Sequence, residues 1–387
     1  MKIKVLISYP YFPHYRLPIL EELERDIDIE YTFISGIKPD MDIKVISPQL
    51  AAEKNLMWKI IENIWLFDHK LLWQRGLIQE CVFGDYDVVI LLGYPYALST
   101  WFASLLSRLS GKIVLFWAHA IVRNQKRDKL KVLFYKLAHG LLLYGNWAKQ
   151  NLTRHGFNQA EMFVVYNSLD YDHQLHLRKL LTPEKLISEK KMLFNNPGNP
   201  VLLFIGRLTS SKRLNQLIAA CEKLHGRGMP VNMLFIGDGE ERRKLHNLCD
   251  QKNLLPYTTF FGECYDEQKL ATLIALADVC VSPGNVGLTA IHALTYGTPV
   301  ITHNKPFAQG PEFEAITHGE TGMFFEQGSV DSLADTIYTW LQLNQNRRNQ
   351  IRNKCYKLVD NYYNPAFQAK EIKVAILKYY SPRKKDL

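Results

Sequence analysis

The sequence predicts an α/β protein built from two doubly wound domains, each with a parallel sheet. Short, almost wholly apolar segments of strand length recur along all 387 residues. Segments with apolar residues at helical spacing separate them, which is typical of parallel sheets covered by helices on both faces. Charge and Pro/Asn density rise near residues 170–200, which indicates a division into two halves of similar size.

In the first half, we expect strands and helices to alternate. The strands are expected at residues 2–7, 29–33, 88–92, 113–117, 140–144 and 162–166, and the helices at about 17–25, 58–81 (continuous or broken), 98–109, 129–138 and 148–155. Residues 88–107 carry no charge over about the length of a membrane span. Because Gly93 and Pro95 interrupt this stretch, we interpret it as a buried strand, a loop and a helix.

The second half repeats this alternation. Its strands are expected at residues 201–205, 232–236, 258–261, 279–282, 299–302 and 322–325, and residues 214–224 show one apolar stripe at helical spacing. We therefore predict a first domain over residues 1–172, a linker over 173–199 and a second domain over 200–361. The final segment, about 362–387, is expected to be helical.

Composition and charge limit the class of protein. The six cysteines are scattered without a Cys-x-x-Cys pair, which argues against a zinc site or a disulfide scaffold and suits a reducing cytoplasm. The first residues lack the apolar run of a signal peptide and are expected to form a strand. No recognition motif for nucleic acid is present.

Much of the net charge of +9 lies in one segment. Residues 117–155 hold a single acid, Asp128, against eight basic residues, which are Arg123, Lys126, Arg127, Lys129, Lys131, Lys136, Lys149 and Arg154. Such a surface attracts anionic lipid headgroups or a lipid-linked pyrophosphate. The alternative is a solvated helix face without a partner.

The most informative stretch is residues 282–302. An apolar strand leads into a turn with Gly284 and Gly287, and a short helix follows. The backbone amides of Gly287, Leu288 and Thr289 open this helix without intrahelical acceptors, at the positive end of the helix dipole. That arrangement suits a phosphate group, although an ordinary tight turn is the alternative.

A second glycine-ended strand lies upstream. The strand expected at 201–205 ends in Gly206, followed by Arg207 and then Lys212 near the start of a helix. Doubly wound domains bind ligands at the carboxyl ends of their strands. Arginine offers a planar fork to phosphate oxygens and lysine a point charge, so a diphosphate is the expected ligand.

Several ordered segments together resemble the nucleotide-sugar half of the retaining family 4 glycosyltransferases, of the kind that build bacterial surface polysaccharides. They are residues 204–212, 235–239, 260–262, 277–283, 287–300 and 319–322. The resemblance implies the GT-B fold, with two Rossmann-like domains facing a central cleft. It also implies that the first domain binds the acceptor, the second binds the nucleotide-sugar donor, and the last helix packs back on the first domain.

One departure from the family is notable. The family carries two glutamates eight positions apart, and those positions hold Gly284 and His292 here. A neutral imidazole can still bond a ribose hydroxyl, whereas Gly284 offers only backbone. Asn285 is the nearest candidate for sugar contacts. Glu312 and Glu314 are the best carboxylates to replace the missing pair.

Further candidate residues lie in the first half and beyond, and the resemblance indicates the first of them. His119 follows the strand expected at 113–117, where the family keeps a histidine near the donor sugar; a structural hydrogen bond is the alternative. The aromatic loop that follows the first strand is expected to bind the acceptor through Tyr11, Phe12, His14 and Tyr15. Cys264 is a further donor-binding candidate.

These features predict a retaining glycosyltransferase that moves a sugar from a nucleotide-diphosphate sugar to a glycan or polyprenyl-linked acceptor. His119, Arg207 and Lys212 are the predicted catalytic residues. No Asp-x-Asp triplet is present near these segments, so we expect no metal and no other cofactor. The expected location is the cytoplasm, at the inner face of the plasma membrane. A nucleotide-sugar epimerase and a non-catalytic binding relative are the alternatives.

Overall fold

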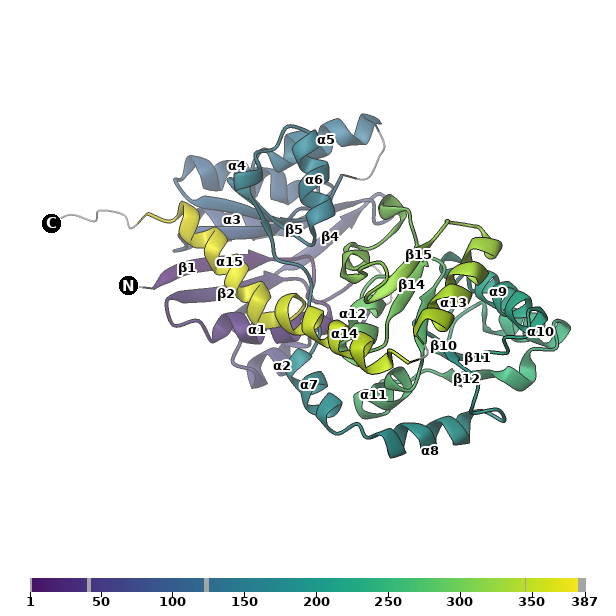
Figure 1. The fold of residues 1–387 in the computed structure, drawn as a ribbon. Coiled ribbons are helices and arrows are strands. Elements are labelled where there is room, and N and C mark those ends of the chain that lie inside the picture. The colour runs from purple at the N-terminus through teal and green to yellow at the C-terminus, as the bar shows by residue number, and fades with distance from the viewer. Residues whose placement is uncertain (1, 40–42, 122–124, 345, 382–387) are drawn as a thin grey trace. The chain divides into compact units, whose positions relative to one another are not determined.

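The chain forms two α/β units, as predicted (Figure 1). The computed structural model describes residues 2–39, 43–121, 125–344 and 346–381, with only the backbone for 125–128. The first unit contains Met1–Asp170 and Asn364–Leu387, and the second contains Tyr171–Tyr363. Among the described residues, no helix has both the length and the apolar character that crossing a membrane requires.

The first unit is built on a parallel sheet with the strand order β3-β2-β1-β6-β7-β8-β9. Its strands are β1 (Ile3–Ser8), β2 (Ile29–Ser35), β3 (Trp58–Ile60), β6 (Val88–Leu92), β7 (Ile113–Ala118), β8 (Gly140–Leu143) and β9 (Met162–Val164). The central strands are buried on both faces, which explains their almost uninterrupted apolar sequences.

Helices cover both faces of this sheet. They are α1 (Leu17–Glu24), α2 (Pro48–Glu53), α3 (Leu77–Phe83), α4 (Leu98–Leu109), α5 (Gln125–Tyr135), α6 (Asn146–Arg154) and α15 (Pro365–Tyr379). Alternate residues of β1 face opposite sides: Val5 and Ile7 lie in one buried cluster, with α1 and α15, and Leu6 lies in the other, with α3 and α4. Residues 88–107 form β6, a loop and most of α4, so their interpretation as strand, loop and helix is confirmed.

The helix predicted over residues 58–81 is wrong. The segment forms β3, an antiparallel hairpin of β4 (Glu62–Leu66) and β5 (Leu71–Arg75), and then α3. Phe67, Asp68 and His69 turn the chain with positive φ angles. The apolar and aromatic residues of this segment pair across the hairpin, and that pairing outweighs the helical spacing that a single segment suggests.

The second unit has a parallel sheet with the order β12-β11-β10-β13-β14-β15. Its strands are β10 (Val201–Ile205), β11 (Asn232–Ile236), β12 (Thr258–Gly262), β13 (Val279–Ser282), β14 (Val300–His303) and β15 (Gly322–Phe325). Its helices are α7 (Tyr171–Lys179), α8 (Pro183–Leu193), α9 (Leu214–Gly226), α10 (Arg242–Gln251), α11 (Glu267–Ala275), α12 (Thr289–Thr295), α13 (Val330–Asn344) and α14 (Arg348–Tyr362).

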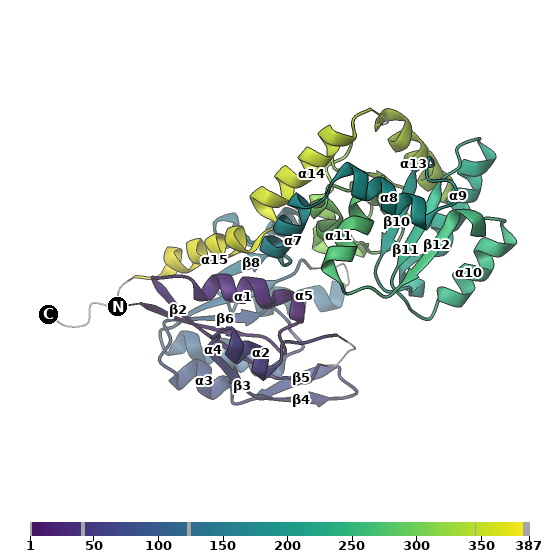
Figure 2. The same cartoon turned by 90° about the horizontal axis from the view of Figure 1, so that it is seen from below.

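Two segments near the division between the units have definite structure. Residues 173–199, predicted as a linker, form most of α7 and all of α8, and both helices pack on α11. The last described helix, α15, runs beside α1 in the first unit (Figure 2). Lys373 of α15 pairs with Asp26 and Asp28, and Gln368 accepts a hydrogen bond from the Ser168 hydroxyl.

Candidate functional site

The strand order of the second unit places its two glycine-rich loops together. β10 lies between β11 and β13, so the chain reverses its direction of winding at β10. In open α/β sheets, ligands bind outside the carboxyl ends of the strands at such a point. The loops that follow β10 (residues 206–213, the β10 loop) and β13 (residues 283–288, the β13 loop) both start there.

The β10 and β13 loops are joined by two hydrogen bonds. The amide of Gly284 donates to the carbonyl of Lys212 at 3.1 Å, and Nζ of Lys212 donates to the carbonyl of Asn285 at 2.7 Å. Lys212 is partly buried, and this burial lowers the pKa of its ammonium group. The structure therefore brings together the two segments that the sequence predicts to share a diphosphate.

Gly284 has no room for a side chain. A Cβ atom at this position would lie 2.2 Å from the carbonyl oxygen of Ser211 and 2.8 Å from Cα of Lys212. Both obstacles are backbone, which cannot rotate away. The family's first glutamate therefore has no place in this backbone, and the glycine is what allows the two loops to meet.

The glycines after β11 have the same kind of role. A Cβ at Gly237 would lie 2.1 Å from the carbonyl oxygen of Gly206, and one at Gly239 would lie 2.4 Å from that of Leu208. The amide of Leu208 donates to the carbonyl of Asp238 at 2.8 Å. Glycine at positions 237 and 239 is thus explained by the close approach of the backbone to the β10 loop.

The start of α12 is tied to the end of β10. The hydroxyl of Thr289 donates to the carbonyl of Ile205 at 3.1 Å, and Gly287 takes a positive φ of 53° just before the helix. The amides of Gly287, Leu288 and Thr289 precede the first intrahelical donor position, so helix geometry gives them no intrahelical acceptor. Gly287 and Leu288 belong to the β13 loop, and Thr289 is the first residue of α12. Arg207, which is exposed, belongs to the β10 loop.

Glu312 lies close to the β13 loop. Its side chain is only 5% exposed, and its Oε2 would be 2.8 Å from a Cβ placed on Gly310. The same Cβ would lie 3.1 Å from Cα of Gly287. Glu312 is thus a carboxylate that the fold brings next to this turn, whereas Glu314, two residues further along the chain, is half-buried.

Gln309 is a residue of this site that the sequence patterns did not indicate. Its Oε1 accepts from the amide of Val286 at 2.9 Å, and its Nε2 donates to the hydroxyl of Thr302 at 2.8 Å. It therefore holds the β13 loop against the end of β14. A single glutamine outside any motif carries no sequence signal for this role.

His292 is engaged by a carboxylate that no sequence motif marks. Its Nε2 lies 2.9 Å from Oε1 of Glu267, the first residue of α11. The same oxygen accepts from the hydroxyl of Tyr296 at 2.6 Å and from Nε2 of Gln174 at 2.9 Å. The predicted ribose contact of His292 therefore has to be made by a ring already oriented by Glu267.

The carboxyl group of Glu267 stays ionised. Burial alone would raise its pKa, but the charge and hydrogen bond of His292, with the hydrogen bonds of Tyr296 and Gln174, lower the pKa to about 2. Because the pKa is depressed in the folded state, the stability that Glu267 contributes is present above its usual value of 4.5 and is lost as the pH falls towards 2.

We expect His292→Glu, which restores the family residue, to destabilise the protein at pH 7 by roughly 2 kcal/mol. The change places a second carboxylate beside Glu267, and like charges at this distance repel. The matched double variant His292→Glu/Glu267→Gln removes one of the two charges and should recover most of the loss. Thermal unfolding at pH 7 and at about pH 3 measures this effect, which should shrink at the lower pH as carboxylates protonate. A single variant as stable as the wild type at pH 7 would contradict the contact.

Cys264 lies apart from the joined loops. It follows β12, the edge strand, and its Sγ contacts the carbonyl of Asp266 at 3.8 Å. Within the described part of the chain, no hydrogen bond connects the Cys264 side chain to the β10 or β13 loop. Donor binding through its side chain stays a prediction.

In the first unit, the predicted acceptor residues divide into core and surface. Phe12 is 2% exposed and packs edge-to-face against Phe33 and Trp58, so its side chain is part of the core, and the acceptor contact expected of it stays a prediction. Burial of an aromatic side chain against the sheet outweighs its position in a loop. Tyr11 and Tyr15 are half-buried and His14 is exposed.

His119 lies directly after β7 and stacks on Tyr144 with ring centroids 4.4 Å apart. Its carbonyl accepts from the hydroxyl of Tyr135 at 2.9 Å. The residue keeps an exposed surface, while partial burial and the nearby charge of Arg16 lower its pKa to about 4. A neutral imidazole therefore stands at the carboxyl end of β7.

Arg16 is a residue of this region that the sequence patterns did not single out. It ends the 3₁₀ turn His14–Arg16, is 4% exposed and lies among aromatic rings near His119. An arginine between a tyrosine and a leucine carries no sign of burial in its sequence. Only the packing of the strand ends around it reveals its environment.

The basic segment is described in part. Arg123 lies outside the described residues, as do the side chains of Lys126, Arg127 and Asp128. Lys129 and Lys136, on or just after α5, are exposed, and Lys131 is half-buried. Among the described residues, no group of three or more His, Cys, Asp or Glu side chains has the geometry to hold a metal ion.

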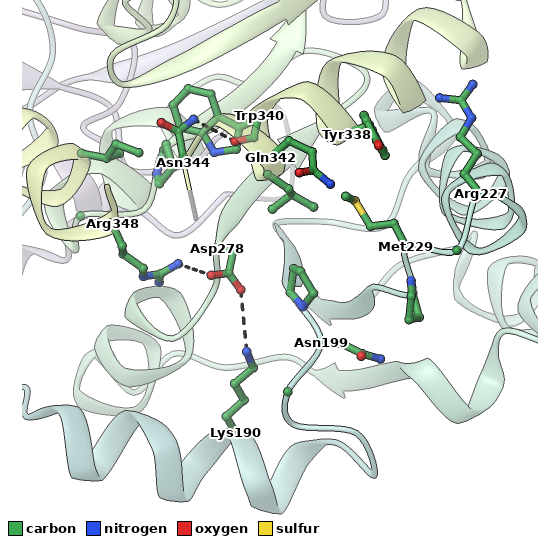
Figure 3. A pocket seen from close by; sticks show the side chains of 18 residues that line it. Lys190, Asn199, Arg227, Met229, Asp278, Tyr338, Trp340, Gln342, Asn344 and Arg348 are labelled. Carbon is green, nitrogen blue, oxygen red and sulfur yellow. Dashed lines mark hydrogen bonds and ion pairs between the residues drawn. The ribbon is translucent and has the colours of Figure 1, made fainter. Parts of the chain in front are cut away.

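A cavity of about 500 Å³ lies elsewhere in the second unit (Figure 3). Its lining includes Pro200, Asp278 and Pro299, which precede β10, β13 and β14. It is therefore at the amino-terminal edge of the sheet, opposite the joined loops. Asp278 bonds Arg348 at 2.5 Å and lies 3.8 Å from Lys190, so the charges that Figure 3 shows there are largely satisfied within the protein.

Residues 187–357 match the family model described as Glycosyl transferases group 1. The match falls within the second unit and identifies a group 1 glycosyltransferase domain there, although it covers less than half of the chain. It contains the β10 and β13 loops, which the structure joins.

Two curated relatives are similar to part of the chain. A glycosyltransferase of Methanocaldococcus jannaschii is 28% identical over 184 residues, which is 46% of this chain and 45% of the relative. The lipopolysaccharide core biosynthesis glycosyltransferase LpsE of Rhizobium meliloti is 27% identical over 154 residues, which is 40% of this chain and 43% of the relative. The chain thus spans less than half the length of these relatives.

The fold as a whole resembles solved structures. The crystal structure of Anabaena HepE in complex with UDP superposes with a TM-score of 0.72 and 15% sequence identity, over 98% of this chain and 100% of that one. This likeness, together with the two parallel sheets, shows the GT-B fold.

Proposed function

We propose that this protein is a retaining glycosyltransferase that moves a sugar from a nucleotide-diphosphate sugar to a glycan or lipid-linked glycan acceptor in surface polysaccharide synthesis. The single observation that carries the proposal is the joining of the β10 and β13 loops at the strand ends of the domain that matches group 1 glycosyltransferases. HepE, which has the same fold, binds UDP, and LpsE acts in lipopolysaccharide core synthesis.

In this proposal, the second unit stabilises the leaving diphosphate. Negative charge gathers on the diphosphate as the glycosidic bond breaks, and preorganised donors aimed at that charge lower the barrier. Arg207, Lys212 and the amides of Gly287, Leu288 and Thr289 supply such donors. Retention follows a front-face route in which the leaving phosphate takes the acceptor proton, so no separate base is needed.

His119 and Glu312 complete the proposed chemistry. His119 presents a neutral ring at the carboxyl end of β7, where it can bond a sugar hydroxyl as donor or acceptor. Glu312, next to the turn at Gly287, offers a carboxylate in place of the family's first glutamate. We propose that neither the donor nor the leaving group requires a metal.

The proposal is tested with a panel of nucleotide sugars, with UDP and GDP as controls. The thermal shift that each produces is measured first, and then transfer to an acceptor extract in excess EDTA. Binding followed by transfer with retention supports the proposal, and recovery of activity only on adding Mn²⁺ or Mg²⁺ overturns the metal-free part. Conversion of the donor sugar without acceptor indicates an epimerase, and binding without transfer indicates a non-catalytic relative.

We also propose that the first unit associates with an anionic membrane surface through α4 and α5. Phe102, Leu105 and Leu109 of α4 are exposed, as are Leu130 and Leu133 of α5. Lysines lie among these apolar side chains on α5, and a mixed apolar and basic surface suits anionic lipid headgroups. We name this surface the α4–α5 face.

Replacing Lys129, Lys131 and Lys136 with Gln should weaken binding to anionic vesicles by about 10²-fold, since each basic residue near such a surface is worth about 1 kcal/mol. Vesicle sedimentation measures the partitioning. The matched control changes exposed lysines of the second unit to Gln, namely Lys179, Lys185 and Lys191. If both triple variants lose vesicle binding equally, or if the first loses none, the α4–α5 face does not bind the membrane and is a solvated surface.

A further inference from the structure

The guanidinium group of Arg16 is enclosed by four aromatic rings. Its Cζ lies 4.7 Å from the ring centre of Trp117, 5.1 Å from that of Tyr144, 5.4 Å from that of Tyr9 and 5.8 Å from that of Tyr15. We call these four rings the aromatic cage. One arm of the guanidinium is engaged, because Nη2 donates to the hydroxyl of Tyr144.

The rest of the Arg16 side chain has unused hydrogen-bonding capacity. Its Nε and Nη1 are buried and have no hydrogen-bond partner among the described residues. The neighbouring groups that act on its pKa are tyrosine hydroxyls, and in the described ranges no carboxylate is among them. Arginine stays charged in proteins, so this is a buried cation without a neighbouring anion.

The aromatic cage offsets only part of the cost of that burial. A desolvated cation is stabilised over an aromatic face, but the four rings share one guanidinium. The two buried nitrogens without acceptors, Nε and Nη1, have lost water and gained no partner in exchange. Arg16 is therefore a buried cation that has no partner of opposite charge among the described residues of the first unit.

The position of Arg16 in the fold is that of a ligand site. The cage is assembled from the ends of parallel strands: Tyr9 and Tyr15 follow β1, Trp117 is near the end of β7, and Tyr144 follows β8. Ligands of open α/β sheets bind at these carboxyl ends. The loop that presents Arg16 contains two prolines, which stiffen it.

The four rings of the cage differ in their burial. Tyr9, Trp117 and Tyr144 are almost fully buried, whereas Tyr15 is half-buried. His119, which is exposed, stacks on Tyr144 beside the cage. Tyr15, the least buried of the four rings, and the exposed His119 are therefore the residues past which an anion would have to approach the guanidinium.

We infer that Arg16 binds an oxyanion of the acceptor, a phosphate or a carboxylate group, and that the acceptor of this protein is negatively charged. That this anion belongs to an acceptor rests on the proposed function, because only a transferase has an acceptor. The oxyanion accepts hydrogen bonds from Nε and Nη1 and supplies the missing opposite charge. Charge-assisted hydrogen bonds of this kind are among the strongest in proteins.

The test is a calorimetric titration with inorganic phosphate, pyrophosphate and glucuronate. The parent protein carries Arg207→Ala and Lys212→Ala, so that the β10 loop does not contribute to the binding of phosphates. Arg16→Met replaces the aliphatic stem of the arginine with an apolar chain that packs against aromatic rings, and Arg25→Met is the matched control, since Arg25 is an exposed arginine of the same unit. We expect Arg16→Met to bind the anion at least about tenfold more weakly, because it lacks a charge-assisted donor pair, and Arg25→Met to bind like the parent.

A second measurement covers the case in which Arg16→Met does not fold. Trp117 lies against the guanidinium, so anion binding in the parent should change tryptophan fluorescence, and Trp117→Phe should remove most of that change. No binding by the parent, or equal binding by Arg16→Met, overturns the inference. Tighter binding of the phosphates indicates a lipid-linked phosphate as the source, and tighter binding of glucuronate indicates an acidic sugar.

Failure of this inference is distinguishable from failure of the proposed function. The titration requires no turnover, and donor binding is measured separately in a protein that carries only Arg16→Met. Unchanged donor affinity with a raised acceptor KM supports an acceptor contact. A loss of donor affinity of the same size would instead show that Arg16 supports the fold as a whole, and would overturn the inference.

Discussion

Gly284→Ala is expected to destabilise the protein by about 3 kcal/mol and to abolish the thermal shift that the nucleotide-sugar donor produces. One methyl group at this position would lie 2.2 Å from the carbonyl oxygen of Ser211, so the β10 and β13 loops must separate. Inserting atoms into a closed contact costs about 1–3 kcal/mol, and here no flexible side chain can move aside. Separation of the loops also moves Lys212 away from the amides of the β13 loop.

Thermal unfolding with and without donor measures this effect. Gly198→Ala is the matched control, because a Cβ at Gly198 meets nothing within 4 Å. Gly284→Glu, the family residue, should be at least as damaging as Gly284→Ala. A Gly284→Ala protein with the stability and donor affinity of the wild type would show that the loops do not meet as the structure has them.

Lys212→Gln is expected to reduce the rate of transfer by about 10²-fold while the protein stays folded, since removal of one preorganised donor to a developing anion costs about this much. Lys212 has two roles, because its Nζ also bonds the carbonyl of Asn285 at 2.7 Å. Glutamine keeps a hydrogen-bond donor but lacks the charge, so this variant separates the two roles. Arg207→Ala should show a loss of similar size.

Steady-state kinetics and thermal unfolding together check this prediction. Lys223→Gln is the control, since Lys223 pairs with Asp331 on the surface. Burial lowers the pKa of Lys212, so the rate should also fall with rising pH before an ordinary lysine titrates, and Lys212→Arg should move that fall upward. If Lys212→Gln keeps a kcat near that of the wild type, Lys212 does not stabilise the leaving group and serves only to join the two loops.

Much of the fold was accessible from local sequence patterns. The strands at 88–92, 201–205, 232–236, 279–282 and 322–325 have the predicted bounds. Each is an apolar run of strand length bounded by turn residues and lies in a parallel sheet covered by helices, so the local pattern and the tertiary environment agree. The segment 58–81 was predicted wrongly because its hairpin depends on cross-strand pairs that a single segment does not reveal.

The sequence by itself determined that two parallel-sheet α/β domains form and which glycine-ended strands carry the candidate donor loops. These features depend on residues close together in the chain, through apolar runs, glycine turns and helix starts. Only the tertiary structure decided that Gly284 closes against Ser211, that His292 bonds Glu267 and that Arg16 lies in an aromatic cage. Each of these contacts joins residues from different elements, and their partners are chosen by the order of strands in the sheet rather than by spacing along the chain.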